Sequence, residues 1–275
     1  MTSSVQHLID VAAQAAVDAG RLIRGKFRGP VTASAKGAAH DVVTEVDRAA
    51  EELIRAALLA AAPHATVIGE EDGRGAGPVS GRDDGPVWAV DPIDGTFNFV
   101  RGIPFFCVSI GLRIDGCTAG GCVYDPVHDE LFTAADGAAF LNGTRVPAQP
   151  AGRAQPPLVL CDIPNAGRPP AAAETDLLAA LLSAAADVRR LGSSALALAY
   201  VAVGRADLAA NADVYDWDTA AGRALVTATG GGYLSHPDPL PTTRQGAFVA
   251  WAPQHEMLGR AVGDALSHDC LEEKV

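Results

Sequence analysis

Two aspartates lie close together at the end of a short apolar segment. Residues 87–90 have the composition of a buried strand, and Asp91 and Asp94 follow it with Pro92 and Ile93 between them. Because proline has no amide proton to donate to a sheet, the pattern predicts that the strand ends at Pro92 and that a tight turn begins. The two carboxylates and the Ile93 carbonyl would then form a compact cluster of oxygen atoms, which is the kind of site that binds Mg²⁺.

The next two residues of this loop, Gly95 and Thr96, could bind a different ligand. Their backbone N–H groups could hold a phosphate against the positive end of a following helix or turn. A metal site and a phosphate site would then meet within one loop. The alternative is an ordinary acidic turn, because Asp, Pro and Gly are all common turn residues. The spacing of these residues alone leaves both interpretations open.

Three other acidic residues each have a plain structural explanation. Asp47 stands three residues after Thr44, and the pair could form a capping box that opens a helix. Glu70 follows a short predicted strand and could belong to a solvated loop. Asp218 precedes a helix predicted over 220–229 and could cap its N-terminus. None of the three explanations excludes a second role in a metal site.

Taken in chain order, these segments resemble the motifs of the inositol monophosphatase family of Mg²⁺-dependent phosphomonoesterases. The matching segments are the Asp-x-Val-Thr-x-x-Asp of 41–47, the Gly-Glu-Glu of 69–71, the Asp-Pro-Ile-Asp-Gly-Thr of 91–96 and the Trp-Asp of 217–218. Their order and approximate spacing agree over residues 36–232, which is most of the chain. The chain is therefore identified from its sequence as a member of that family.

The resemblance implies a role for each residue of the predicted site. Thr96 and Asp47 form a hydrogen-bonded pair that acts with Glu70 on the water attacking the phosphate. The backbone of Gly95 and Thr96 binds the phosphate, and Ser194 contacts the alcohol of the substrate. The implied ligands of two or three Mg²⁺ ions are Glu70, Asp91, the carbonyl of Ile93, Asp94 and Asp218.

Asn211 departs from the family pattern. Members that prefer inositol phosphates carry a glutamate seven residues before the Trp-Asp acid, whereas asparagine can hydrogen-bond but has no charge. Asp213 and Asp216 lie nearby and could replace the glutamate. Lys36 matches a family position near the metals and could offset charge, although a loop lysine is often merely solvated.

The implied activity is hydrolysis of a small-molecule phosphate monoester by metal-activated water. Inositol 1-phosphate or a related sugar or polyol phosphate is the expected substrate, and histidinol phosphate, 3′-phosphoadenosine 5′-phosphate and fructose 1,6-bisphosphate are the alternatives. A protein of another class, which binds metal and phosphate for regulation without catalysis, is a further alternative. Such a protein is expected to lose at least one acidic ligand, and this chain has all of them.

The composition limits the partners and the compartment. The 275 residues include 21 basic and 33 acidic ones, and the formal net charge of −12 argues against a nucleic-acid partner. The five cysteines contain no Cys-x-x-Cys pair and fit a reducing compartment. The sequence has no signal-peptide pattern and no apolar run long enough for a membrane, so we expect a cytoplasmic protein. The resemblance implies a homodimer.

The strand and helix patterns predict two halves that pack together. In residues 1–150, successive strands with short connections favour a largely antiparallel sheet, and this half carries most of the metal ligands. In residues 151–275, strand-helix-strand spacing favours an α/β half that supplies Asp218 and substrate contacts. A segment rich in Pro, Ala and Gln at 147–157 marks the boundary. The resemblance implies that the halves stack as a layered αβαβα sandwich.

Overall fold

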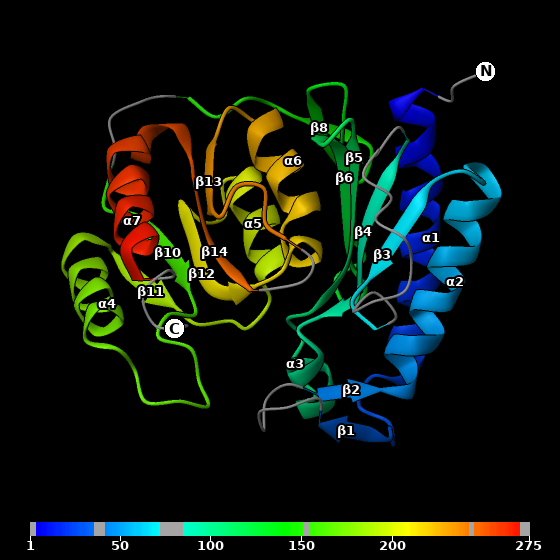
Figure 1. Ribbon diagram of the computed structural model, residues 1–275, viewed down its shortest axis with the longest axis horizontal. Helices are drawn as coiled ribbons and strands as arrows, with labels where there is room; N and C mark the ends of the chain where they lie inside the picture. The colour runs from blue at the N-terminus through cyan, green and yellow to red at the C-terminus, as the bar shows by residue number, and fades with distance from the viewer. Residues whose placement is uncertain (1–3, 36–41, 72–84, 151–154, 242–244, 270–275) are drawn as a thin grey trace.

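The computed structural model describes residues 4–35, 42–71, 85–150, 155–241 and 245–269. Two β-sheets alternate with three layers of helices (Figure 1), which is the predicted αβαβα sandwich. The first helix layer is α1 and α2, the middle layer is α5 and α6, and the last is α4 and α7. The helices are α1 (Val5–Lys26), α2 (Glu45–Ala61), α3 (Thr96–Arg101), α4 (Ala172–Ala184), α5 (Ser194–Ala202), α6 (Ala220–Ala228) and α7 (Glu256–Asp269).

The first sheet has seven strands in the order β3-β4-β5-β6-β7-β8-β9, and it is antiparallel except for the β3–β4 pair. The sequence correctly predicted this arrangement, including the tight turn at Asn142 and Gly143, whose φ angles are both positive as a type I′ turn requires. The strands are β3 (Thr66–Gly69), β4 (Val87–Asp94), β5 (Cys107–Ile114), β6 (Cys117–Asp125), β7 (Glu130–Ala135), β8 (Ala138–Leu141) and β9 (Thr144–Val146).

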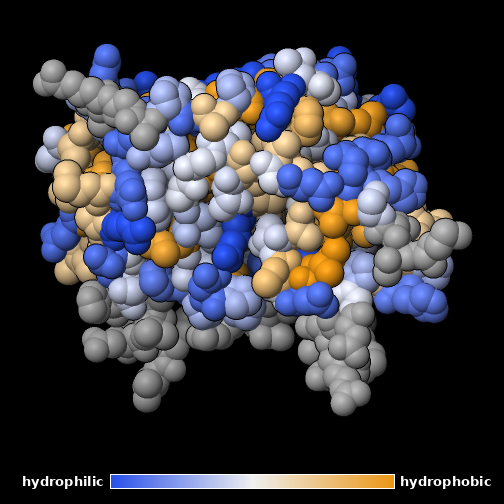
Figure 2. Space-filling view, turned by 90° about the horizontal axis from the view of Figure 1, so that it is seen from above, coloured by the Kyte–Doolittle hydropathy of each residue, from blue (hydrophilic) through white to orange (hydrophobic). Residues whose placement is uncertain are grey.

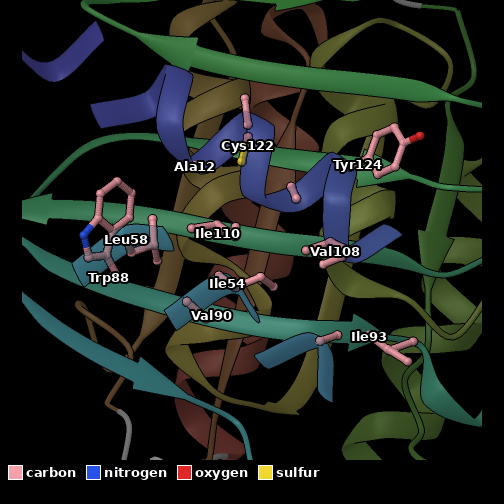
Figure 3. Packing of buried hydrophobic residues seen from close by; sticks show 14 of the residues in the cluster. Ala12, Ile54, Leu58, Trp88, Val90, Ile93, Val108, Ile110, Cys122 and Tyr124 are labelled. Carbon is pink, nitrogen blue, oxygen red and sulfur yellow. The ribbon is translucent and has the colours of Figure 1, made fainter. Parts of the chain in front are cut away.

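Helices α1 and α2 cover the outer face of this sheet. Helix α1 begins after Ser4, whose side chain accepts from the His7 amide, and α2 begins with the predicted capping box of Thr44 and Asp47. Their apolar faces pack on β4, β5 and β6, as Figure 3 shows for Ile54 against the sheet. The same core encloses the Ile93 side chain, which anchors the end of β4.

The second sheet has five strands in the order β11-β10-β12-β14-β13. The β10-α4-β11 unit is parallel, as strand-helix-strand spacing predicted, and β12 is also parallel to β10. The strands are β10 (Leu158–Cys161), β11 (Asp187–Arg189), β12 (Leu208–Val214), β13 (Gly232–His236) and β14 (Gly246–Trp251). A separate antiparallel pair is formed by β1 (Ala33–Ala35) and β2 (Val42–Thr44).

The middle helix layer lies between the two sheets, and its sequence reflects burial on all sides. Helix α5 is apolar around its whole circumference, as expected for a helix enclosed by sheets. Helix α6 approaches β5 and β6 closely because Gly111 and Gly121 face it. A Cβ atom at Gly111 would lie 2.4 Å from the Cβ of Ala220, and one at Gly121 would lie 2.7 Å from the Cα of Ala221. These glycines fix the position of the segment that leads into α6.

The surface mixes hydrophilic and hydrophobic residues. Figure 2 shows blue side chains distributed among smaller orange groups over the face seen from above. Among the residues that the structure describes, no helix has both the length and the apolar character that crossing a bilayer requires.

Candidate metal and phosphate site

The site begins where β4 leaves its regular pairing with β5. Strand β4 continues to Asp94, so the prediction that Pro92 ends it was wrong. Asp91 lies opposite Ser109 and Asp94 opposite Cys107, and the register shifts between them. The irregularity tolerates Pro92 because a residue in a bulge need not donate to the ladder. As a result, Asp91 and Asp94, which are both buried, lie within the last four residues of a rigid strand.

Asp218 joins them from the other half of the chain. It ends a 3₁₀ turn, Asp216–Asp218, and its carboxylate accepts from the Tyr215 amide at 2.7 Å. Thr219 occupies the N-cap position of α6, so the prediction that Asp218 caps that helix was wrong. Ligand oxygens of Asp218, Asp91 and Asp94 all lie within 4.8 Å of one another.

Glu70 lies beside this cluster at the end of β3. Strands β3 and β4 are parallel neighbours, so their carboxyl ends meet at one edge of the sheet. The Glu70 amide donates to the Val90 carbonyl at 3.1 Å, which continues the pairing one residue beyond the strand. Its carboxylate is close enough to help raise the pKa of Asp91. The structure therefore brings all four acids together from three separate segments.

The cluster holds more negative charge than its surroundings can stabilise. Burial raises the pKa of Asp91 and of Asp218 well above the ordinary value of 3.8, and repulsion from neighbouring acids adds to both shifts. Burial also raises the pKa of Asp94, to about 6, although hydrogen bonds from Ser193 and the following amides act against it. Protons or a cation must therefore compensate the carboxylates at neutral pH.

Asp94 is held by the start of α5, a contact that the sequence did not predict. The hydroxyl of Ser193 donates to Asp94 at 2.5 Å, and the amides of Ala195 and Ser194 donate at 2.7 and 3.3 Å. Ser193 is also the N-cap of α5. The Gly-Ser-Ser start of this helix was visible in the sequence, but nothing there indicated an acceptor about a hundred residues away.

Thr96 and Asp47 form the predicted hydrogen-bonded pair. The Thr96 hydroxyl lies 2.9 Å from Asp47 Oδ1 and 2.8 Å from the Ile93 carbonyl. Asp47 Oδ2 accepts from the Thr44 amide at 2.9 Å, so Asp47 both caps α2 and contacts the metal loop. Burial raises the pKa of Asp47. Since a hydroxyl has one proton, Thr96 donates to one of its two acceptors at a time.

Gly95 is required by the geometry of the loop. Its φ is +97°, and a Cβ atom there would lie 3.0 Å from the Gly192 carbonyl oxygen and 3.1 Å from that of Phe105. Helix α3 starts at the next residue, Thr96, and the amides of its first turn have no acceptor within the helix. Gly95 and Thr96 both line the cavity described next, as a phosphate-binding backbone would require.

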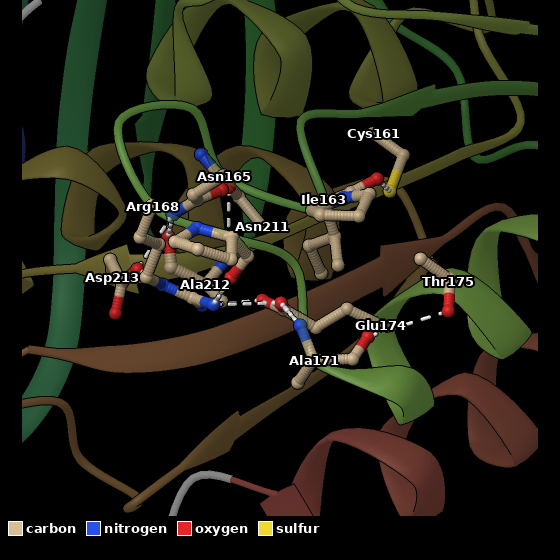
Figure 4. A network of polar contacts seen from close by, with 12 residues as sticks. Cys161, Ile163, Asn165, Arg168, Ala171, Glu174, Thr175, Asn211, Ala212 and Asp213 are labelled. Atoms are coloured by element: carbon tan, nitrogen blue, oxygen red, sulfur yellow. Dashed lines mark hydrogen bonds and ion pairs between the residues drawn. The ribbon is translucent and has the colours of Figure 1, made fainter.

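The acids and this backbone line one cavity of about 600 Å³ between the two halves. Its opposite wall comes from the second half, and Figure 4 shows part of it around Asn165 and Asn211. Ser194 lies in this wall and accepts from the Asn211 side chain at 3.0 Å. Lys36, the remaining predicted residue, lies outside the described residues. Cavity-lining residues that the sequence analysis did not single out include Phe97, Asp162, Asn165, Arg168, Arg190 and Tyr215.

The donor set fits a hard divalent cation. Every candidate ligand in the cluster is an oxygen atom, Asp91 and Asp94 are buried and Asp218 is half-buried, and burial and mutual repulsion raise the pKa values of all three. These are the properties of a site that could bind a divalent metal ion.

Comparisons with known proteins agree with this geometry. The model of the inositol monophosphatase family matches residues 4–265. Nus factor SuhB of Escherichia coli (strain K12) is 40% identical over 227 residues, which are 82% of this chain and 83% of that protein. Inositol monophosphatase 3 of Solanum lycopersicum is 40% identical over 231 residues, which are 83% of this chain and 85% of that protein. The crystal structure of extragenic suppressor protein suhB from Bartonella henselae superposes with a TM-score of 0.80 at 30% identity. The superposition covers 98% of this chain and 100% of that chain.

Proposed function

Because the chain belongs to the inositol monophosphatase family, we propose that it is a Mg²⁺-dependent phosphatase for a small-molecule phosphate monoester. The observation that carries the proposal is the convergence of Asp91, Asp94 and Asp218 in the cavity that Gly95 and Thr96 also line. The substrate we propose is inositol 1-phosphate or a related sugar or polyol phosphate.

In this proposal Glu70, Asp91, Asp94, Asp218 and the Ile93 carbonyl hold two or three Mg²⁺ ions. Bound there, the ions would supply Lewis-acid stabilisation of negative charge on the phosphate and would lower the pKa of nearby water.

The protein groups then position the substrate and the attacking water. The backbone N–H groups of Gly95 and Thr96 bind the phosphate oxygens and fix its orientation. The Thr96 hydroxyl orients the attacking water, and its own proton is held by Asp47 at 2.9 Å. Asp47 is itself fixed by the capping box of α2, so the pair cannot turn away from the loop. Ser194 and Asn211 contact the alcohol part of the ester from the opposite wall.

Phosphate release from four esters tests the proposal. Inositol 1-phosphate, histidinol phosphate, 3′-phosphoadenosine 5′-phosphate and fructose 1,6-bisphosphate would be supplied in turn with Mg²⁺ or with EDTA. We expect Mg²⁺-dependent release, fastest from the inositol ester. Preference for another ester would keep the phosphatase and change its substrate. A Glu70→Gln variant should lose turnover while keeping the thermal transition of the wild type.

The second candidate is a regulatory protein that binds metal and phosphate without catalysis. The name of the Escherichia coli relative, Nus factor SuhB, does not describe a hydrolase, and it favours such a role. The complete set of four acids favours catalysis, because a protein without turnover has no need to keep every ligand. Mg²⁺ binding by calorimetry without hydrolysis of any of the four esters would support the regulatory role.

We also propose that the protein is a cytoplasmic homodimer, as the family resemblance implies. Sedimentation velocity on the purified protein measures the oligomeric state directly, and a monomer at micromolar concentration would contradict this part of the proposal.

A further inference from the structure

The Asn211 side chain already makes two hydrogen bonds within the protein. Its Oδ1 accepts from the Ala212 amide at 2.8 Å, and its Nδ2 donates to the Ser194 hydroxyl at 3.0 Å. The position that carries glutamate in the family pattern therefore presents to the cavity at most one remaining lone pair of a neutral amide oxygen, which is a weaker acceptor than a carboxylate. A polyol or sugar, whose hydroxyl groups need acceptors, must find a stronger one elsewhere on this wall.

Asp213, two residues later, lies at an irregularity in the same strand. Pairing of β12 with β14 shifts register between Ala212 and Val214, and Asp213 between them has a φ of +58°. Aspartate tolerates this left-handed conformation better than most residues do. Because side chains alternate along a regular strand, the shift changes which residues face the cavity, and Asp213 is one that lines it.

One oxygen of the Asp213 carboxylate is held by a hydrogen bond, and the other can accept a further one. Its Oδ2 accepts from Asn165 Nδ2 at 3.0 Å, and the same amide group donates to the Ala212 carbonyl at 2.7 Å. Within the part of the chain that the structure describes, Asp213 Oδ1 has no hydrogen-bond donor. The side chain keeps 35% of its surface exposed. Figure 4 shows Asp213 beside Asn165 and Arg168 at the edge of the network.

Arg168, the basic residue that pairs with Asp213, compensates its carboxylate only weakly. Arg168 lies 3.7 Å from Asp213 Oδ2, but its guanidinium donates two shorter bonds, of 2.8 and 2.5 Å, to Glu174. Glu174 is fixed in turn by the Ala171 amide at 2.8 Å. The arginine is therefore directed mainly toward Glu174, and a negative charge at Asp213 stays available to the cavity. A hydroxyl group of a substrate could donate to it.

Asp216, the other acid near Asn211 in the sequence, cannot take this role. It is buried, it pairs with Arg113 at 3.1 Å, and it does not line the cavity. Its side chain instead joins the 3₁₀ turn of Asp218 to strand β5.

We propose that Asp213 is a specificity-determining residue that accepts hydrogen bonds from substrate hydroxyl groups, in place of the glutamate that Asn211 replaces. The inference rests on the proposed phosphatase function and narrows its substrate to the phosphate ester of a polyhydroxylated alcohol. Asn165 is the positioning residue that directs the Asp213 carboxylate.

Two phosphate esters that differ only in ring hydroxyls test this role. They are inositol 1-phosphate and cyclohexyl phosphate, and the second is measured as a substrate or, where its turnover is slow, as a competitive inhibitor. In Asp213→Asn and Asp213→Gly, selectivity for the inositol ester should fall by about 10- to 100-fold, the worth of a hydrogen bond to a charged group. The loss should be mainly in KM. Asp136→Asn is the matched control, because Asp136 is exposed and also left-handed (φ +50°) but lies in the β7–β8 turn.

The outcomes separate this inference from the function on which it rests. If the wild type hydrolyses the inositol ester and both Asp213 variants keep its selectivity, the role of Asp213 is refuted and the phosphatase is not. An equal loss on both esters would mean that Asp213 only supports the fold, which also refutes the role. If the wild type hydrolyses none of the four esters of the activity assay with Mg²⁺, the proposed function fails together with this inference, whereas turnover of histidinol phosphate without turnover of the inositol ester would refute this inference alone. Asp213→Gly, which relieves the left-handed strain, provides the second variant if Asp213→Asn folds poorly.

Discussion

Replacing Asp91 with asparagine should make the metal-free protein more stable while removing its Mg²⁺-dependent turnover. Asparagine has the shape of aspartate, and its Oδ1 can still accept from the Ile93 amide, now 2.9 Å from the carboxylate. Its NH₂ group would face Glu70 and Asp218, whose charges contribute to the raised pKa of Asp91. The substitution thus replaces a repulsive contact with a donated hydrogen bond and deletes one metal ligand.

The size of the effect follows from the spacing of the acids. The ligand oxygens of Asp91, Asp94 and Asp218 lie within 4.8 Å of one another. Two unit charges at that separation repel by ~3.5 kcal/mol at an effective dielectric constant of about 20. Protons shared by the cluster reduce the repulsion that is actually present at pH 8. We therefore expect Asp91→Asn to raise the free energy of unfolding in EDTA by ~2–4 kcal/mol, or the melting temperature by roughly 5–10 °C.

The gain in stability of the Asp91→Asn variant over the wild type should increase as the pH rises. A carboxyl group with a raised pKa binds its proton more tightly in the folded than in the unfolded state, so its contribution to stability falls as pH rises through that pKa. For Asp94, with a pKa of about 6 against the ordinary 3.8, the fall lies between about pH 4 and 6, and the higher pKa values of Asp91 and Asp218 extend it upward. The advantage of Asp91→Asn should therefore be large at pH 8 and small at pH 5.

Urea denaturation in EDTA at pH 5 and pH 8 measures this difference, and phosphate release with Mg²⁺ measures the loss of turnover. Asp125→Asn is the matched control, because Asp125 is equally buried and accepts from the Val127 amide at 2.9 Å but lies outside the cavity. That variant should be less stable than the wild type at both pH values. An Asp91→Asn protein that is less stable than the wild type in EDTA at pH 8, or that turns over substrate at saturating Mg²⁺, would refute the reasoning.

Three further predictions concern metal affinity and the core. Ser193→Ala removes the hydroxyl that donates to Asp94 at 2.5 Å and should weaken Mg²⁺ binding by roughly 10-fold in calorimetry, whereas Ser193→Thr should retain most of it. The Mg²⁺ affinity of the wild type should fall as pH is lowered from 8 to 6, because the acids must lose their protons to bind the ion, and an affinity independent of pH would contradict the raised pKa values. Ile54→Ala empties a fully buried position under the first sheet and should lower the free energy of unfolding in urea by ~2–5 kcal/mol.

The sequence predicted the first half of the fold better than the second. Strands β5 to β9 have β-branched or aromatic residues and clear turn signals such as Asn142-Gly143, so their local preferences agree with the final sheet. Strand β12, Leu208–Val214, was missed because three of its seven residues are alanine and two others are Asn and Asp. Alanine has no preference for strands, and this segment becomes one because β10 and β14 flank it.

The site residues were predicted from short motifs, and the errors concern how those residues are held. Pro92 was expected to end β4 because a proline interrupts a ladder, but the register shift beside it removes the need for a donor. Asp218 was expected to cap α6, but its carboxylate accepts from Tyr215. The support of Asp94 by Ser193 was not expected at all, because a contact between residues 99 positions apart leaves no local pattern.

The site lies where the two halves of the chain meet, and its residues are also the contacts that join the halves. The Ser109 hydroxyl on β5 donates to the Trp217 carbonyl at 3.1 Å, and the Asn98 side chain at α3 donates to the Leu191 carbonyl at 2.6 Å. The Asp94 carboxylate, at the end of β4, accepts hydrogen bonds from the start of α5. Each of these bonds crosses from the first half of the chain to the second, close to a candidate ligand. A cation that Asp94 and Asp218 share would therefore bind only to the assembled protein, so its binding energy would stabilise the packing of the halves as well as the loop.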